Sequence, residues 1–461
     1  MRDPLSVVVL AAGQGTRMRS RLPKVLQPLA GRTLLTHVLD TALALQPDRL
    51  LVVYGHGGEE VIAVHQNHPV SWIHQPEQLG TGHAVGCALG SIPDGHRVLV
   101  LCGDVPLITP QALRPLAEGQ GLELLTVTVD DPSGYGRILR DGQGRVCAIR
   151  EERDADAAER SVREVNTGLL AAPAERLRDW LGRLSADNQQ GEYYLTDIVG
   201  EAVRDGDPVE AVPAPEAAET VGINDPLQLA EAERIYQARA ARDLLARGLR
   251  LTSAERMVLR GELAFGYDCR IDPDCLIEGR VELGDDVRIG QGVILRNARI
   301  EDGAEIEAYS VVEDAEIGAG ARVGPFAHLR RGTALGSGAR IGNFVETKNA
   351  TLGAGAKANH LTYVGDAEVG AGANLGAGTI TCNYDGAHKH RTRIGEQAFI
   401  GSGSQLVAPV AIGARATIGA GTTVTRDAAA DALTVGRCRT RTIPGWLNPG
   451  LTSDHGPEED S

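Results

Sequence analysis

The first half of the chain contains a glycine-rich turn that carries two cations. Residues Leu10 to Met18 read LAAGQGTRM, and Lys24 follows soon after. Glycines in such a turn let backbone N–H groups face a phosphate, and Arg17 and Lys24 can neutralise charge on a transferring phosphoryl group. The spacing fails the dinucleotide fingerprint, because Met18 occupies its third glycine position, and it is not a Walker loop. The turn therefore indicates either a phosphate site or merely a tight connection between a strand and a helix.

Two further segments of the first half carry side chains suited to a nucleotide. The segment Gln75–His83 offers a side-chain amide beside a second glycine turn, and an amide can both donate to and accept from a base edge. Asp104 comes just after the apolar run Val98–Cys102, at the strand end where open α/β sheets bind ligands. A carboxylate there is an ordinary Mg²⁺ ligand beside a triphosphate, although alone it could merely cap a helix.

The second half of the chain is built on a six-residue repeat. From Ile271 to Val424 an aliphatic residue, often followed by glycine, recurs at more than twenty positions, mostly six apart with occasional fives. This period predicts a parallel β-helix in which each hexapeptide forms one side of a triangular coil. The narrow core of such a coil needs few aromatic residues, in keeping with 57 Gly but only 4 Phe, 3 Trp and 9 Tyr.

His360 has a place in this repeat that core packing does not explain. The aliphatic position points inward, and His360 comes two residues after it, in a column that faces outward. The same column carries the small residues Ala377, Ser402 and Ala420, which leave a trough. An exposed histidine beside a groove is an available general base near neutral pH. The loop Thr381–His390, which breaks the period, could wall that groove.

The elements around these residues predict two differently built halves. Residues 1 to about 222 alternate apolar, β-branched runs with helical patterns such as Thr33–Leu45, which predicts βαβ units on a largely parallel sheet. A helix follows whose ends are marked by Asp225 as N-cap, Pro226 in the first turn and Gly248 at the end. We expect this helix to link the two halves.

Composition argues against several classes of function. The formal charge of −15, from 61 acidic and 46 basic residues, argues against an extended nucleic-acid surface, while a pocket for a small anion needs only a few cations. The apolar stretch Leu5–Ala12 is too short for a membrane span and lacks a cleavage-site pattern. We therefore expect no membrane insertion, no signal peptide and a cytoplasmic location. The 7 cysteines include no CxxC pair, which argues against zinc and structural disulfides.

Together and in this order, the segments of the first half resemble the sugar-nucleotidyltransferase family. Followed by a hexapeptide solenoid, they resemble the bacterial family of bifunctional N-acetylglucosamine-1-phosphate uridyltransferases/glucosamine-1-phosphate acetyltransferases. The resemblance spans nearly the whole chain and includes GYGRI (Gly134–Ile138), EVNTG (Glu164–Gly168), GEYYLTD (Gly191–Asp197) and GIN (Gly222–Asn224). It implies a Rossmann-like α/β nucleotidyltransferase domain followed by a left-handed parallel β-helix of hexapeptide repeats.

The resemblance implies two activities in the synthesis of UDP-N-acetylglucosamine, a cell-envelope precursor. The β-helix domain, residues 251–451, would transfer acetyl from acetyl-CoA to glucosamine 1-phosphate. The α/β domain, residues 1–223, would couple the product to UTP with Mg²⁺ and release pyrophosphate. Residues 224–250 would be a linker helix and residues 452–461 a disordered tail. Relatives of this family are trimers with shared sites, so we expect a homotrimer.

Carried over to the matching positions, the resemblance assigns the site residues of both activities. UTP and the sugar nucleotide would contact Leu10, Ala11, Ala12, Gly13, Arg17, Lys24, Gln75, Gly80, Thr81, Gly136, Glu151, Asn166 and Asn224. Mg²⁺ would be held by Asp104 and Asn224. Glucosamine phosphate would contact Arg330, Lys348, Tyr363, Asn374 and Lys389. Acetyl-CoA would contact Ala377, Asn383, Tyr384, Ser402, Ala420 and Arg437, and His360 would be the catalytic base.

Two alternatives are open at this point. The first half could be a nucleotidyltransferase for another sugar or nucleotide while the second half acylates a different amine, and a panel of substrates would separate these cases. The β-helix could also serve only as an assembly scaffold, a reading against which His360 and the loop that begins at Asn383 argue.

Overall fold

A computed structural model describes residues 3–13, 15–55, 57–436 and 440–446. Its internal contacts divide the chain into two compact units. The first comprises the described residues up to Arg247 together with Ser253–Glu262, and the second comprises Gly248–Thr252 together with those from Leu263 onward. Arg437 and the expected tail, residues 452–461, lie outside the described residues.

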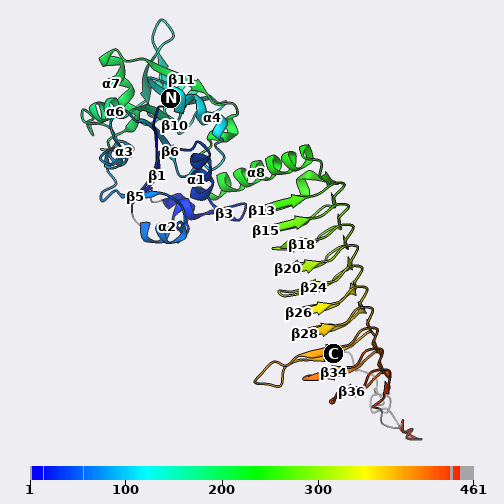
Figure 1. Cartoon of the computed structure of the whole chain (residues 1–461). Coiled ribbons are helices and arrows are strands. Elements are labelled where there is room, and N and C mark those ends of the chain that lie inside the picture. Colours follow the sequence, from blue (N-terminus) through cyan, green and yellow to red (C-terminus); the bar gives the residue numbers. More distant parts are fainter. Residues whose placement is uncertain (1–2, 14, 56, 437–439, 447–461) are drawn as a thin grey trace, which may run out of the picture. The chain divides into compact units, whose positions relative to one another are not determined.

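The first unit is built on a sheet with the strand order β11-β7-β10-β6-β1-β4-β5 (Figure 1). Neighbouring strands are parallel except at β10, which runs antiparallel to β6 and β7. A hairpin of β8 and β9 pairs with β10, and β2 and β3 form a separate small hairpin. The strand bounds are β1 Leu5–Ala11, β2 Pro28–Leu29, β3 Arg32–Thr33, β4 Arg49–Tyr54, β5 Ser71–His74, β6 Arg97–Cys102, β7 Leu122–Thr128, β8 Arg137–Arg140, β9 Val146–Arg150, β10 Glu164–Pro173 and β11 Val209–Pro213.

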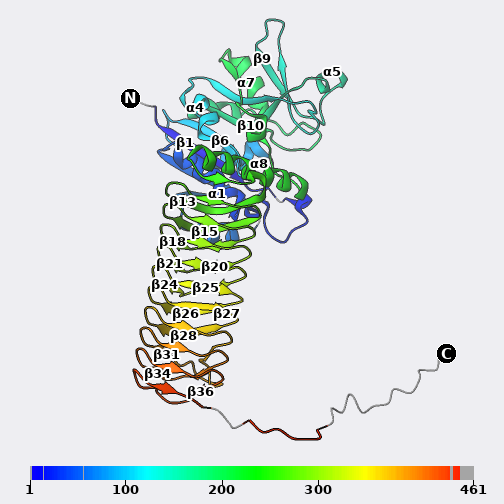
Figure 2. The ribbon, with the colours of Figure 1, turned by 90° about the vertical axis from the view of Figure 1, so that its right-hand side faces the viewer.

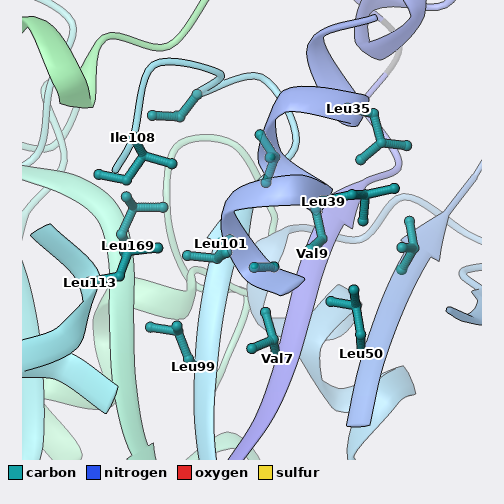
Figure 3. Packing of buried hydrophobic residues seen from close by; sticks show 14 of the residues in the cluster. Val7, Val9, Leu35, Leu39, Leu50, Leu99, Leu101, Ile108, Leu113 and Leu169 are labelled. Atoms are coloured by element: carbon teal, nitrogen blue, oxygen red, sulfur yellow. The ribbon is translucent and has the colours of Figure 1, made fainter. Parts of the chain in front are cut away.

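Both faces of this sheet are buried. Successive residues of β1 alternate between two hydrophobic clusters, with Val7 and Val9 in one and Val8 in the other. Figure 3 shows Val9 next to Leu39, which belongs to helix α1 (Leu34–Ala44), and Val7 between Leu99 and Leu50 of the neighbouring strands. A strand that is buried on both faces has a continuous apolar sequence, which explains why the first apolar run shows no alternation.

Helices cover the sheet and begin where their capping residues predict. The side chain of Thr33 accepts a hydrogen bond from Thr36 N at the start of α1, and that of Asp225 accepts one from Gln228 N at the start of α8. Among the described residues, none of the helices is long and apolar enough to cross a membrane. The bounds are α2 Gly58–Val64, α3 Thr81–Leu89, α4 Pro110–Glu118, α5 Ala157–Arg160, α6 Ala174–Leu181, α7 Ile198–Asp205 and α8 Pro226–Ala246.

The second unit is a stack of coils with strands in parallel register (Figure 2). The predicted inward positions stack on one another, as in the pairings of Ile341 with Ala358, Ala358 with Leu375 and Leu375 with Ile400. The pairing of Leu375 with Ile400 means that the longer interval there holds an outward loop. Stacking of aliphatic side chains from coil to coil is what stabilises a solenoid of this kind.

The strands of these coils form two sheets, here named sheet C and sheet D. Sheet C consists of β12 Arg250–Leu251, β14 Arg270–Ile271, β16 Arg288–Ile289, β19 Glu305–Ile306, β22 Arg322–Val323, β25 Arg340–Asn343, β27 Lys357–His360, β29 Asn374–Leu375, β32 Phe399–Ile400, β35 Thr417–Ile418 and β37 Leu433–Thr434. Sheet D includes β15 Cys275–Leu283, β17 Ile294–Arg296, β18 Arg299–Ile300, β20 Val311–Glu313, β21 Glu316–Ile317, β23 His328–Leu329, β24 Ala334–Leu335, β26 Glu346–Leu352, β28 Tyr363–Val369, β30 Ile380–Cys382, β31 Thr392–Ile394, β33 Gln405–Val407, β34 Val410–Ile412 and β36 Thr423–Val424. Strand β13 (Met257–Phe265) lies between β12 and β14 in the sequence.

One corner of the coils carries exposed apolar side chains on left-handed backbone. Tyr309, Phe326, Phe344 and Leu361, here called the corner column, have φ values of 58, 54, 56 and 49°. Their rings and side chains are 49 to 61% exposed, and the rings of Phe326 and Phe344 stack at 5.5 Å. Left-handed backbone costs an L-residue other than glycine on the order of 1–2 kcal/mol. Both the left-handed backbone and the exposure of apolar surface to solvent are therefore unfavourable at this corner.

Candidate active sites

The first unit contains a cavity of about 580 Å³ at the carboxyl ends of β1 and β6. Open α/β sheets bind ligands at this edge. The structure brings together in its lining a large part of the predicted nucleotide set, namely Leu10, Ala11, Ala12, Gly13, Arg17, Lys24, Gln75, Gly80, Thr81, Asp104 and Asn224. Gly15, Val25, Gln78, Ala84, Cys102 and Glu192 complete the lining, and the sequence had assigned no role to them.

Lys24 joins the two predicted metal ligands in this cavity. Its ammonium group donates to a carboxylate oxygen of Asp104 and, at 3.1 Å, to the side-chain oxygen of Asn224. The segment that contains Asn224 is held in place because Ile223 N donates to Asp104 O at 2.8 Å. A carboxylate and an amide oxygen thus meet at a point that already accommodates a cation. This donor set fits Mg²⁺, which commonly binds one or two protein oxygens together with substrate phosphates.

The turn Gln75–His83 is fastened to the GEYYLTD segment. Gly82 N donates to Tyr193 O at 2.8 Å, and Tyr193 N donates to Leu79 O at 2.8 Å. Gly80 has a φ of 112°, and a Cβ there would lie 2.6 Å from Tyr193 O, so only glycine fits. In the sequence analysis GEYYLTD is part of the family resemblance and has no role of its own. In the structure this segment supports the turn Gln75–His83, which faces the cavity.

Gly136, Glu151 and Asn166 form a second group outside the residues that line the cavity. Asn166 N donates to Gly136 O at 2.8 Å, and a Cβ at Gly136 would lie 3.3 Å from the Glu151 carboxylate. Thr196 donates to Glu151 at 2.9 Å, a partner that sequence reasoning missed. Burial raises the pKa of the Glu151 carboxyl, and the Thr196 hydrogen bond opposes that shift.

Cys102 connects this second group with the cavity. Its thiol lines the cavity and lies 3.7 Å from Gly168 O in the EVNTG segment. Burial, with a smaller contribution from Asp104, raises the pKa of the thiol to about 12. The side chain is therefore a neutral part of the wall.

In the second unit, His360 lies at the end of β27 with an exposed side chain. Its Nδ1 lies 2.7 Å from Asn343 Oδ1, one coil earlier. An amide oxygen can only accept a hydrogen bond, so Nδ1 is the donor and Nε2 carries the free lone pair. The predicted general base is thus held in the tautomer that a base requires. Asn343 pairs with His360 in register, and the sequence analysis predicted no role for it.

The column below His360 is arranged as the repeat predicts. Gly378 N donates to Leu361 O at 3.1 Å, Gly403 N to Ala377 O at 2.8 Å and Gly421 N to Ser402 O at 2.8 Å. Ala377, Ser402 and Ala420 therefore occupy equivalent places in successive coils. In these coils the corner position is occupied by Gly378, Gly403 and Gly421 instead of the bulky residues of the corner column.

The predicted glucosamine-phosphate residues lie on different sides of the coils. Lys348 is on β26 and Tyr363 on β28 of sheet D, whereas Asn374 is on β29 of sheet C. Arg330 follows β23 and pairs with Glu346 at 2.7 Å, and this hydrogen bond raises the pKa of the Arg330 guanidinium. Arg330 and Tyr363 both neighbour Glu346, because Tyr363 pairs with Glu346 in the next coil.

The loop that breaks the period is a short hairpin. Tyr384 and Lys389 form an antiparallel bridge, and Asn383 donates to Asp366 at 2.5 Å. Tyr384 and Lys389 are both exposed. The loop thus presents an aromatic side chain and a cation to solvent or to a neighbouring molecule.

Family models match both units. A MobA-like NTP transferase domain matches residues 7–191, a GMPPB C-terminal domain matches residues 259–358, and the bacterial transferase hexapeptide (six repeats) matches residues 391–426. The fold and sites thus define a nucleotidyltransferase joined to a hexapeptide-repeat transferase. The predicted fold class, a Rossmann-like domain followed by a left-handed parallel β-helix, is confirmed.

Full-length relatives specify the family. The bifunctional protein GlmU of Halorhodospira halophila is 68% identical over 461 residues, which cover 100% of this chain and 98% of that protein. GlmU of Alkalilimnicola ehrlichii is 56% identical over 464 residues, 100% of both chains, and GlmU of Aromatoleum aromaticum is 56% identical over 96% and 98%. This chain belongs to the GlmU family, and it is a bifunctional uridyltransferase and acetyltransferase of UDP-N-acetylglucosamine synthesis.

Proposed function

We propose that the two reactions take place at the two sites described above. Uridyl transfer occurs in the cavity of the first unit with Mg²⁺, and acetyl transfer occurs beside His360 in a homotrimer. The observation that carries the first assignment is the meeting of Lys24, Asp104 and Asn224 in the cavity that Gln75 also lines. For the second it is the hydrogen bond between His360 and Asn343.

Uridyl transfer needs no nucleophile from the protein. A phosphate oxygen of N-acetylglucosamine 1-phosphate attacks the α-phosphorus of UTP in line, and pyrophosphate leaves. Arg17 and Lys24 neutralise charge on the phosphates as it shifts toward the leaving group. Mg²⁺ bound by Asp104 and Asn224 would add positive charge at the same phosphates. Gly136, Glu151 and Asn166 bind the sugar.

Acetyl transfer needs a base. His360 Nε2 takes a proton from the 2-amino group of glucosamine 1-phosphate, the nitrogen attacks the thioester carbonyl of acetyl-CoA, and the C–S bond breaks to release CoA. Asn343 holds the imidazole in position for this transfer. Ala377, Ser402, Ala420, Asn383, Tyr384 and Arg437 bind acetyl-CoA, and Arg330, Lys348, Tyr363, Asn374 and Lys389 bind the sugar phosphate.

The corner column supports a trimer. Four bulky apolar side chains on strained backbone end at Leu361, the residue directly after His360. A second copy of the chain that covered them would offset both exposure and strain. Both donors, UTP and acetyl-CoA, are cytoplasmic metabolites, which supports a cytoplasmic location.

A single omission experiment tests this assignment. Purified full-length protein is given glucosamine 1-phosphate, acetyl-CoA, UTP and Mg²⁺, each is omitted in turn, and the products are identified by mass. We expect N-acetylglucosamine 1-phosphate to accumulate without UTP or without Mg²⁺, and no UDP-sugar to form without acetyl-CoA. A UDP-sugar of another mass would contradict the substrate assignment, and full uridyl transfer without divalent metal would contradict the Mg²⁺ site.

A further inference from the structure

The side-chain amide of Gln75 is hydrogen-bonded to His83. Gln75 follows β5 and is 2% exposed, while His83 lies in the first turn of α3. Gln75 Nε2 lies 3.2 Å from Gly80 O and 3.1 Å from His83 Nδ1. A residue that lines the nucleotide cavity is thus tied to a histidine outside its lining.

These contacts determine which end of the amide faces the cavity. The Gly80 carbonyl can only accept, so the amide nitrogen of Gln75 lies on that side. Its second N–H reaches His83 Nδ1, which must then be the unprotonated ring nitrogen. The ring proton is on Nε2, 3.8 Å from Cys87 Sγ. Gln75 Oε1 accepts no hydrogen bond from the described residues, so it is the atom available to a base.

We propose that His83 is the positioning residue that makes the uridyltransferase select uracil over cytosine. This inference rests on the proposed contact between Gln75 and the base of UTP. Uracil presents an N3–H donor, which Gln75 Oε1 can accept, whereas cytosine presents an N3 lone pair that repels the same oxygen. His83 accepts a hydrogen bond from the second amide hydrogen and thereby disfavours the flipped orientation of the Gln75 amide. In the flipped orientation the amide N–H would donate to N3 of cytosine, so the site would bind cytosine.

The surroundings of His83 favour this role over simple packing. Its other side borders a separate opening of about 370 Å³, lined mainly by Leu181, Leu184 and Tyr193. No carboxylate, lysine or arginine lines that opening among the described residues. The ring therefore has Gln75 and Cys87 as its described side-chain partners. A histidine kept only for its volume could be replaced by leucine without changing base selection.

The test compares three variants of the full-length protein. His83→Leu removes the acceptor, His83→Asn places an amide oxygen near the position of Nδ1, and Cys87→Ala removes the other partner of the ring. For each, kcat/KM is measured with UTP and with CTP in the presence of N-acetylglucosamine 1-phosphate. One hydrogen bond supports a change of about tenfold, so His83→Leu should lower the UTP to CTP ratio by about that factor. His83→Asn should restore most of the ratio, and Cys87→Ala should leave it unchanged.

The outcomes separate this inference from the proposed function. A wild-type enzyme that does not use UTP would refute the proposed function itself. A wild-type enzyme that uses UTP and CTP equally, or a His83→Leu enzyme with the wild-type ratio, would refute only the role of His83. A fall in the UTP to CTP ratio that is as large for His83→Asn as for His83→Leu would also refute the role of His83.

A measurement without any substitution guards against a variant that fails to fold. Nitrogen-15 NMR of histidine-labelled wild-type protein reports which ring nitrogen of His83 carries the proton. A neutral ring protonated at Nε2 supports the inference. A proton on Nδ1 would overturn it, because that nitrogen could not accept from Gln75.

Discussion

The side-chain oxygen of Asn343 accepts a hydrogen bond from Nδ1 of His360 at 2.7 Å, across two successive coils of the β-helix. The pair is exposed to solvent, so the hydrogen bond contributes little to folding and acts mainly by fixing the imidazole. Each coil supplies one half of the arrangement. The stacking of coils is therefore what fixes the position of the His360 imidazole.

Replacement of His360 by alanine should lower acetyl transfer by about two or more orders of magnitude, the usual contribution of a positioned base. Uridyl transfer should be unchanged, because its proposed site lies in the other unit. Both rates can be measured on one preparation with glucosamine 1-phosphate and with N-acetylglucosamine 1-phosphate. A normal rate of acetyl transfer by this variant would show that His360 is not the base.

Asn343→Ala should reduce acetyl transfer by about tenfold, as expected when one orienting hydrogen bond is lost but the base is kept. The loss should be in kcat rather than in KM for acetyl-CoA, because Asn343 orients the base and does not bind the thioester. Uridyl transfer serves as the internal control. An Asn343→Ala enzyme as inactive as the His360 variant would indicate that Asn343 touches the substrate itself.

Asp104→Asn should keep the fold but reduce uridyl transfer by about 100-fold, since a neutral amide is a poorer Mg²⁺ ligand than a carboxylate. The remaining activity should require more Mg²⁺ for saturation, which a metal titration would show. Acetyl transfer should not change. Equal losses in both reactions would mean that Asp104 is structural.

Glu151→Gln should stabilise the first unit at neutral pH. Burial raises the folded-state pKa of Glu151, so its favourable contribution to folding is present below the unfolded pKa and is lost as pH rises through the folded pKa. The variant should melt about 2 °C higher at pH 7, the scale of a small stability change in a domain of this size. The difference should vanish near pH 4, and uridyl transfer should fall. A lower melting temperature at pH 7 would contradict this account.

Phe344→Asn tests the corner column. Asparagine adopts left-handed backbone more readily than phenylalanine, so the single chain should fold at least as well. Sedimentation should show dissociation of the proposed trimer, and acetyl transfer should fall to the same extent while uridyl transfer persists. Tyr267→Asn is the matched control, because Tyr267 is 83% exposed but lies outside the column. A fully active monomer would refute the shared site.

The sequence predicted the inward face of the coils well, because a period of six is a local property that the register of Ile341, Ala358 and Leu375 confirms. The hydrogen bond that His360 donates to Asn343 could not be derived, since it depends on the direction of the two side chains. The meeting of Lys24, Asp104 and Asn224 joins residues up to 200 positions apart. A local sequence pattern can indicate each of these residues separately. Only the folded structure shows which of them are in contact.

The coil register also has a consequence for how this chain can vary. Paired positions such as Ile271, Ile289 and Ile306 contact only the coils directly before and after them. A whole coil could therefore be deleted or duplicated in the stretch between Ile271 and Ile306 without altering any contact around His360. The β-helix is in this sense modular, because its length can change by whole coils while the side chains around His360 keep their arrangement.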